Sequence, residues 1–392
     1  MAVKIKGTPE EFFVEEMISL PFEETRGCAP FRVYRLEKRG WNTLDALREA
    51  ARTSGLSLQD IRYGGKKDRH AHTIQYLTAP ARVDLSFSSP NVSISPVGYS
   101  SEAMSPHFIR GNRFTLTLRA IAPADETHFL GRLLEIRDLG FANYFDDQRF
   151  GSVGNDGAFF GERVVRGHYN GALKLYFTTI HPEAPSAAKE RKRAMETLWG
   201  QWDTLLPLCA TPLHREIMEI LRRHGGDRGG LPALQRIPRE ELSLHFAAYQ
   251  SFLWNEVLRR LVLRHARETF SVKGKTGEYV HFRNPGRQGG ARLGALSLPT
   301  VASRMEATDP ECLELIEEVL AERNVRRAQF NLREIRQSYF SSFLRAAVVV
   351  PGEFTWSRPE EDERYPGKCK STLSFLLPRG SYATMLVKSL GL

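Results

Sequence analysis

Hydrophobic and polar positions alternate with a period of two in several segments, which is the pattern of half-buried strands. The alternation is strictest at 112–119, NRFTLTLR, where one phenylalanine and two leucines take every second position. Residues 31–39, with a basic face, and 73–77 are predicted strands as well. So are 343–350 and 371–377, near the other end of the chain.

The segment PEEFFVEE, residues 9–16, predicts a buried edge strand because Phe12 and Val14 alternate with acidic positions. Successive side chains of a strand point to opposite faces, so the adjacent Phe12 and Phe13 cannot share a face. One of these two phenylalanines is therefore left for another use.

Helical spacing appears at 126–138 and after Asn42 or Thr43, either of which can cap a helix that ends at Ser54-Gly55. From about 161 to 337 longer helical segments dominate. One of them presents an apolar stripe that predicts a core-facing helix: Phe246, Tyr249, Leu253, Val257 and Leu261.

Two glycine-rich stretches, 225–230 and 284–294, are expected to be flexible connections. Basic runs such as Arg222-Arg223 are expected to be solvated helix faces first and phosphate contacts second.

Composition places the chain among ordinary globular proteins. Its residues are 41% hydrophobic and 26% charged. The length of 392 residues is enough for two or three domains. The formal net charge of +9, from 55 Lys plus Arg against 46 Asp plus Glu, favours a polyanionic partner.

The cysteines and the N-terminal segment bear on the cellular compartment of the protein. The four cysteines form no C-x-x-C pair, which predicts free thiols in a reducing cytosol and no zinc site: Cys28, Cys209, Cys312 and Cys369. The N-terminus has no apolar signal region and no stretch approaches a membrane span, so we expect a cytoplasmic protein with no membrane partner.

The candidate chemistry centres on 63–77, YGGKKDRHAHTIQYL, where Asp68 follows two glycines and two lysines. Gly64-Gly65 predicts a sharp turn with positive φ that holds the acid at the entrance of a strand. Surrounding positive charge favours an ionised carboxylate, as a nucleophile requires. The alternative is a solvated turn in which Asp68 caps a backbone amide, and charged glycine-rich turns of this kind are common.

A second candidate lies at 141–157, where aromatic residues crowd into a glycine-rich turn beside Asn143 and Arg149. Such a turn suits a platform for stacking bases. It suits a packed aromatic corner equally well. Two familiar motifs fail: Gly274-Lys275-Thr276 lacks the leading glycine of a phosphate loop, and the P-C-x-x-C of zinc deaminases is absent. Neither ATP nor zinc is therefore implied.

The sequence contains the separated segments PEEFFVEE, GGKKDRHAHTIQ, GNRFTLTLR, NYFDDQRFG and LPRGSYATMLV, with YQSFLWNEV as a sixth. Together these segments resemble the TruD family of tRNA pseudouridine synthases. The resemblance implies an α+β fold, in which the pseudouridine synthase catalytic domain has a mixed, largely antiparallel sheet flanked by helices. The catalytic domain would comprise 1–164 and 341–392, and an inserted TRUD-type α/β domain would occupy 165–340.

The resemblance also implies a reaction. Asp68 falls on the family's catalytic aspartate, and the substrate would be uridine 13 in the D arm of tRNA. Uracil is detached from its ribose, rotated and rejoined through C5, by attack of the aspartate on either the uracil ring or the ribose. The resemblance thus implies a reaction with no cofactor and no metal. The base must leave its stack, which costs a few kcal/mol that aromatic stacking can offset.

Carried over position by position, the family's nucleotide contacts fall on Phe12, Asn143, Phe145 and Tyr382. Phe145 would stack on uracil, Asn143 would hydrogen-bond to the nucleotide, and Phe12 and Tyr382 would wall the pocket. Lys6 falls on a basic position that could pair with Asp68. The sequence departs from a common family form at Asp146, where glycine usually stands.

Two alternatives to this function stay open. A catalytically silent RNA-binding protein or RNA chaperone could use the same scaffold, although the intact GGKKD turn favours an enzyme. The same chemistry could also serve another structured RNA. We expect a monomer.

Overall fold

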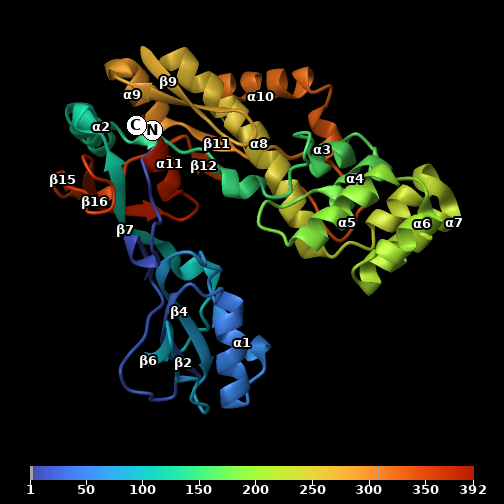
Figure 1. Ribbon diagram of the computed structural model, residues 1–392, viewed down its shortest axis with the longest axis horizontal. Helices are drawn as coiled ribbons and strands as arrows, with labels where there is room; N and C mark the ends of the chain where they lie inside the picture. The colour runs from blue at the N-terminus through green and yellow to red at the C-terminus, as the bar shows by residue number, and fades with distance from the viewer. Residues whose placement is uncertain (1–2, 307–308) are drawn as a thin grey trace. The chain divides into compact units, whose positions relative to one another are not determined.

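The computed structural model describes residues 3–306 and 309–392. The chain forms two compact units (Figure 1). The first contains the residues up to Gly140 together with Val349–Leu392, and the second is Phe141–Val348. The limits of 165 and 340 implied for the inserted domain stay a prediction.

The first unit is built on one large sheet. Within the described residues ten strands join it, in the order β14-β16-β7-β1-β4-β2-β6-β5, with β15 beside β16 and β3 beside β4. The strands are β1 Phe12–Ile18, β2 Phe31–Arg39, β3 Arg62–Tyr63, β4 His72–Pro80, β5 Phe87–Ser89, β6 Val92–Ser100, β7 Ile109–Ile121, β14 Gly352–Trp356, β15 Glu360–Glu361 and β16 Cys369–Pro378. The helices of this unit are α1 Thr43–Ser54, α2 Glu126–Leu139 and α11 Ala383–Lys388.

Strand β1 lies in the interior of this sheet, so the predicted edge position is wrong. It pairs antiparallel with β7 and parallel with β4. Its alternation is as expected, since Phe12 and Val14 are buried and Phe13 is half-buried on the other face. An interior strand shows the same alternation as an edge strand when one sheet face is better covered than the other, so the pattern could not separate the two.

Helix α1 covers one face of the sheet at β2 and β4. Its apolar residues Ala46, Leu47, Ala50 and Ala51 pack with the inward side chains of the strands in one core. Fully burying one such leucine contributes about 2 kcal/mol. The helix ends at Gly55, whose φ of +68° is the left-handed conformation in which glycine is favoured.

A buried ion cluster holds the returning segment of the chain on this sheet. Arg119 of β7 is 6% exposed and pairs with Glu11 at 2.8 Å, Asp362 at 2.7 Å and Glu363 at 2.7 Å. Burial would raise the pKa of Asp362, but the Ala120 amide and the Arg119 guanidinium hold it below its usual value. Residues far apart in the sequence are therefore tied together by charge.

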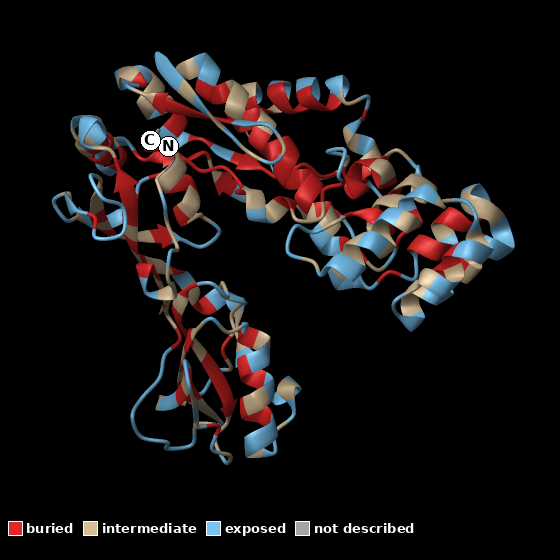
Figure 2. Ribbon diagram, viewed as in Figure 1, coloured by how far each residue is buried: buried red, intermediate tan, exposed pale blue. Residues whose placement is uncertain are grey.

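The second unit is mainly helical. Its helices are α3 Phe160–Val165, α4 Tyr169–Thr178, α5 Ser186–Thr197, α6 Trp202–Leu205, α7 Pro212–Leu234, α8 Arg239–His265, α9 Gly286–Ala295 and α10 Pro310–Glu322. Its short strands are β8 Phe141–Ala142, β9 Glu268–Lys273, β10 Glu278–Arg283, β11 Ser297–Pro299 and β12 Leu344–Ala346, and the boundary between the two units along the chain falls within β13 Val348–Val349. Figure 2 shows buried residues along most of α8, and all five residues of the predicted stripe are buried.

The predicted fold class is confirmed: the chain is α+β, with a large, mostly antiparallel sheet flanked by helices. The four cysteines are free thiols. Among the described residues no helix is long and apolar enough to cross a membrane. The predicted strand at 343–350 is wrong in extent, because 344–346 (β12) and 348–349 (β13) form two separate short strands. Ala347 lies between them and donates its amide to the Leu296 carbonyl.

Both predictions of a flexible glycine-rich connection are wrong. Residues 225–230 lie inside α7, which kinks at Gly225 with φ of +72°, and most of 284–294 lies in α9. Some of these glycines serve close packing. A Cβ atom on Gly226 would lie 2.4 Å from the Asn170 amide, and one on Gly289 would lie 2.1 Å from the His265 carbonyl oxygen.

We predict that replacing two glycines of α9 by alanine has different effects on stability. Gly289→Ala should lower the free energy of unfolding by about 1–3 kcal/mol, because backbone atoms cannot yield to the added methyl group as a side chain could. Gly294→Ala should leave stability unchanged or raise it by up to about 1 kcal/mol, since a Cβ there meets nothing within 4 Å. Thermal unfolding followed by circular dichroism measures both, and equal effects would contradict the packing role.

Candidate active site

The turn that carries Asp68 runs from Gly64 to Ala71, between β3 and β4. The expected positive φ is wrong for both glycines, since neither adopts it. Gly64 is required for space instead, because a Cβ there would lie 2.3 Å from Ile109 Cδ1. Nothing comes within 4 Å of a Cβ placed on Gly65.

Two buried polar side chains fix this turn. The Gln75 amide donates to the Gly65 carbonyl at 3.1 Å, and the Thr43 hydroxyl donates to Gln75 Oε1 at 3.0 Å. The same hydroxyl accepts the Lys67 amide at 3.0 Å. Thr43 therefore holds the turn, and Asn42, the other residue predicted to cap the helix, takes the N-cap position of α1.

Asp68 forms an ion pair and also caps a nearby backbone amide. Its Oδ2 pairs with Lys6 Nζ, and its Oδ1 accepts the His70 amide at 2.9 Å, which is a local cap. The side chain is 32% exposed. Burial would raise the pKa of Asp68, but the hydrogen bond and charge of Lys6 and the His70 amide outweigh it and hold the pKa below its usual value. The carboxylate is therefore ionised at neutral pH and reachable from solvent.

Lys6 is placed by an uncommon backbone conformation. Its φ of +61° is left-handed, which costs a residue with a Cβ roughly 1–2 kcal/mol. The ammonium group lies 4.2 Å from the centroid of the Phe12 ring. The structure thus brings together three predicted site residues, Lys6, Phe12 and Asp68.

Lys38 is a member of this site that the sequence analysis missed. It is fully buried, and its Nζ donates to the backbone carbonyl of Asp68 at 2.8 Å. Burial is the main cause that lowers the pKa of Lys38 to about 8, with Asp68 opposing and Lys67 adding to the shift. The sequence did carry a signal for this burial, because Lys38 lies two residues after the inward-facing Leu36 and so falls on the same face of β2.

Lys67 turns into the sheet on the same side. Its Nζ pairs with Glu16 of β1 at 2.7 Å and donates to Asn112 of β7 at 2.7 Å. The Glu16 side chain is wholly buried, and its other oxygen accepts the Tyr76 amide at 3.2 Å. Two strands, β1 and β7, therefore contribute the partners that hold Lys67 and with it the turn that carries Asp68.

Asn143 and Phe145 lie in the second unit and are both 3% exposed. Asn143 Oδ1 accepts from Arg345 at 2.7 Å, and its amide group donates to the Ala346 carbonyl at 3.0 Å. The Phe145 ring meets Trp254 edge to face at 5.3 Å, and the Arg345 guanidinium lies 4.2 Å from its centroid.

The aromatic segment around these two residues is a packed corner. The rings of Phe141, Tyr144, Phe145 and Phe150 are all buried, which fits packing better than an open platform. Asp146 has φ of −81°, a value that does not require the glycine usual in the resembling family. The departure at this position therefore leaves the backbone unstrained.

Tyr382 lies in the first unit, after the turn that follows β16, and caps the start of α11. It is partly exposed. The preceding strand, β16, belongs to the layer that holds Phe12, because Phe12, Phe114 and Phe375 form a row of ring contacts across β1, β7 and β16.

Comparison with known proteins gives one consistent result. The family model described as tRNA pseudouridine synthase D (TruD) matches residues 1–390. A tRNA pseudouridine synthase D of Leptospira interrogans, strain Fiocruz L1-130, is 30% identical and aligns with 98% of this chain and 95% of its own. A probable tRNA pseudouridine synthase D 2 of Methanocaldococcus jannaschii is 31% identical, over 98% of this chain and 91% of its own.

A solved structure shares the fold. The crystal structure of a protein proposed to be tRNA pseudouridine synthase D from Methanosarcina mazei superimposes with a TM-score of 0.74 at 22% identity. The match covers 99% of this chain and 93% of the other.

We predict that Lys38→Met changes how stability depends on pH. The pKa of Lys38 is about 8 in the folded chain and about 10.5 in the unfolded chain, so between these values the unfolded chain binds more protons. The stability of the unsubstituted protein should therefore rise, relative to the variant, by about 3 kcal/mol from pH 8 to pH 10.5. Denaturant unfolding at stepped pH measures this difference.

Lys66→Met is the matched control, because Lys66 is exposed in the same turn. It removes the same charge and should show no such divergence. Parallel stability curves for Lys38→Met and the unsubstituted protein would contradict the buried, low-pKa state of Lys38.

Proposed function

We propose, on the premise that this chain belongs to the tRNA pseudouridine synthase D (TruD) family, that it isomerises uridine 13 in the D arm of tRNA, with Asp68 as the nucleophile. Family membership makes the chain a pseudouridine synthase. The target position and the nucleophile are the proposed part. A cytoplasmic location and a monomeric state stay predictions from the sequence.

The observation that carries the proposal is the state of Asp68. A partly exposed carboxylate paired with Lys6 stays ionised at neutral pH, and an ionised carboxylate is what either attack on the uracil ring or attack on the ribose requires. Each oxygen has one protein partner, which leaves lone pairs for a reacting carbon.

The isomerisation balances without another reactant. The bond between ribose C1′ and uracil N1 breaks, and a bond between C1′ and C5 forms. The hydrogen of C5 leaves as a proton, and N1 gains one. Asp68 is proposed to hold the intermediate covalently between the breaking of the C1′–N1 bond and the formation of the C1′–C5 bond, so that water does not intercept the intermediate.

The two phenylalanine rings assigned to the nucleotide, Phe12 and Phe145, are each positioned by specific neighbouring groups. Phe12 lies beside the Lys6 ammonium group, next to Asp68. Phe145 is held at its backbone by Asn255, which accepts its amide and donates to its carbonyl, both at 2.9 Å. Since this ring is almost wholly buried, stacking on uracil requires its surroundings to open when RNA binds.

We predict that Asp68→Asn leaves the fold and the affinity for tRNA intact and lowers isomerisation on the order of 10⁴-fold or more, because the amide keeps the shape but is not a nucleophile. Tritium release from tRNA labelled at C5 of uridine measures the rate, and filter binding measures the affinity. Asp60→Asn, at an exposed carboxylate, is the charge-matched control and should keep full activity.

Near-normal turnover in Asp68→Asn would refute the nucleophile assignment. A transcript with cytidine at position 13 should release no tritium, and release from it would refute the target position. Unsubstituted protein that binds tRNA and leaves every uridine intact would indicate a catalytically silent RNA-binding protein.

We further predict that Phe145→Leu lowers the single-turnover rate about 10- to 100-fold, with a smaller loss of tRNA affinity, because stacking worth about 1–3 kcal/mol is lost only when the base is extruded. Phe150→Leu is the matched control, since that ring is equally buried in the same segment. Both variants should lose similar thermal stability. An equal loss of rate in both would attribute the effect of Phe145 to packing.

A further inference from the structure

The segment 331–343 of the second unit crosses the surface between η7 (Arg327–Phe330) and β12 without forming a helix or a strand. It is nevertheless firmly seated. Ile335, Ser338 and Phe340 are buried, and the Phe340 ring stacks on Phe246 with centroids 4.5 Å apart.

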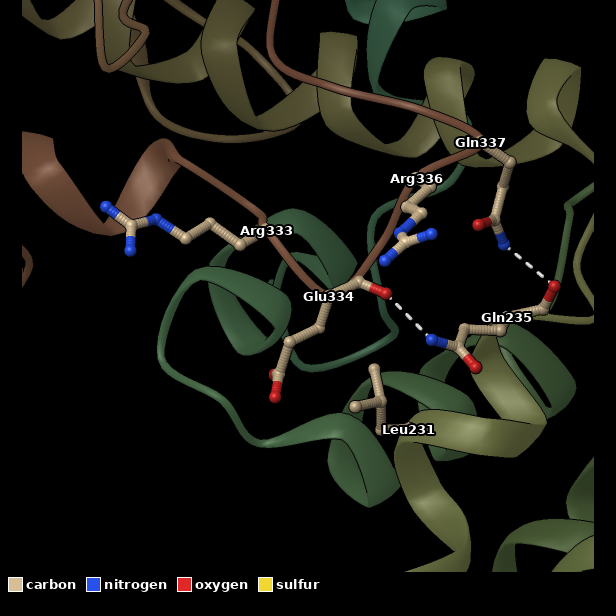
Figure 3. Close-up of a pocket in the computed structure, with 6 residues that line it drawn as sticks. All are labelled: Leu231, Gln235, Arg333, Glu334, Arg336 and Gln337. Carbon is tan, nitrogen blue, oxygen red and sulfur yellow. Dashed lines mark hydrogen bonds between the residues drawn. The ribbon is translucent and has the colours of Figure 1, made fainter.

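Hydrogen bonds of three glutamine side chains fix this segment in place. Gln235 donates to the Glu334 carbonyl at 2.7 Å, and Gln337 donates back to the Gln235 carbonyl at 2.8 Å, as the dashed lines in Figure 3 show. Gln250 donates to the Ser341 carbonyl at 2.9 Å. An irregular segment anchored in this way presents its outward side chains at fixed positions.

Those outward side chains are Arg333, Arg336, Tyr339 and Phe343, which we name the 333–343 strip. Tyr339 is 65% exposed and Phe343 is 50% exposed. Over 3–306 and 309–392, neither arginine side chain has a carboxylate partner, and neither ring stacks on another. Two guanidinium groups and two aromatic faces are thus left for an external partner.

Two surface pockets adjoin the strip. The larger, of about 610 Å³, is lined by Arg333 and Arg336 together with Leu231, Gln235, Glu334 and Gln337 (Figure 3). The smaller, of about 380 Å³, is lined by Arg333 and Arg304 among others. Arg333 lines both pockets, so its guanidinium group is accessible to a phosphate group of a bound RNA.

The acid beside the arginines is already engaged. The Glu334 carboxylate accepts the Tyr169 hydroxyl at 2.9 Å. It forms no ion pair with Arg333 or Arg336 among the pairs that the described residues make. Glu334 keeps its negative charge, and the two arginines outweigh it, so segment 331–343 carries a net positive charge.

We propose that the 333–343 strip binds an unpaired stretch of the RNA substrate, with Arg333 and Arg336 on successive phosphates and Tyr339 and Phe343 stacked on bases. The planar guanidinium matches phosphate geometry, and single-stranded RNA is recognised through stacking on aromatic rings. The inference rests on the proposed function, because it takes that function's RNA as the partner.

The first test replaces both arginines. Arg333→Gln/Arg336→Gln should weaken binding of a full-length tRNA transcript on the order of tenfold at 50 mM salt. It should also lower the slope of log affinity against log salt by about 1.4, the value for two single-strand phosphate contacts. Fluorescence anisotropy measures both quantities without turnover, so the result stands whether or not Asp68 is the nucleophile.

Arg222→Gln/Arg223→Gln is the matched control, because it removes the same charge from an exposed face of α7 in the same unit. It should reduce affinity by about twofold or less. Equal losses in the two double variants, or an unchanged salt slope in the first, would overturn the proposal and leave only a general attraction of basic surface for RNA.

The second test separates the ring from the charge. Tyr339→Leu should weaken tRNA binding about 5- to 100-fold with little change in salt slope, and Tyr339→Phe should restore it, because stacking needs only the ring. Tyr339 is exposed, so thermal unfolding should be unaffected in both. Equal affinity of Tyr339→Leu and the unsubstituted protein would remove the stacking role.

Discussion

A carboxylate that must stay ionised in a half-buried site depends on the amines around it. Asp68 meets this condition through Lys6 at its side chain and Lys38 at its backbone carbonyl. Concentrating lysines in a partly dry place is itself unfavourable, and the lowered pKa of Lys38 reflects that cost. The third lysine, Lys67, is accommodated by the buried Glu16. Each charge at this site thus has a defined partner, and removing one changes the energy of the others.

The interior position of β1 makes this arrangement possible. Its parallel pairing with β4 sets Val14 beside Thr73, and its antiparallel pairing with β7 sets Glu16 beside Asn112. The sheet thereby carries Phe12 and Glu16 on the face toward which the Asp68 turn folds. An edge strand would offer neighbours on one side only, and the partners of Lys67 would then not converge.

Local sequence patterns were sufficient wherever a regular period determines the structure. The strands at 31–39 and 112–119 and the stripe of α8 follow from alternation or helical spacing alone. Contacts between residues far apart in the sequence could not be predicted from local patterns. The requirement for Gly64 arises from Ile109, and the burial of Lys38 is explained only by the carbonyl of Asp68. The glycines of α7 and α9 look like linkers in sequence because close packing and flexibility favour the same residue.

The ion cluster around Arg119 joins β7 to a segment that the ribosome makes much later. β7 pairs with β16 in the finished sheet, and all of Phe141–Val348 is synthesised between them. The continuous second unit can fold as it emerges, whereas the first waits with one edge of β7 unpaired and Arg119 without two of its acidic partners. An unpaired edge strand is a template for association with other chains. The nascent chain is therefore most prone to aggregate during this interval, and the arrival of β16 ends it.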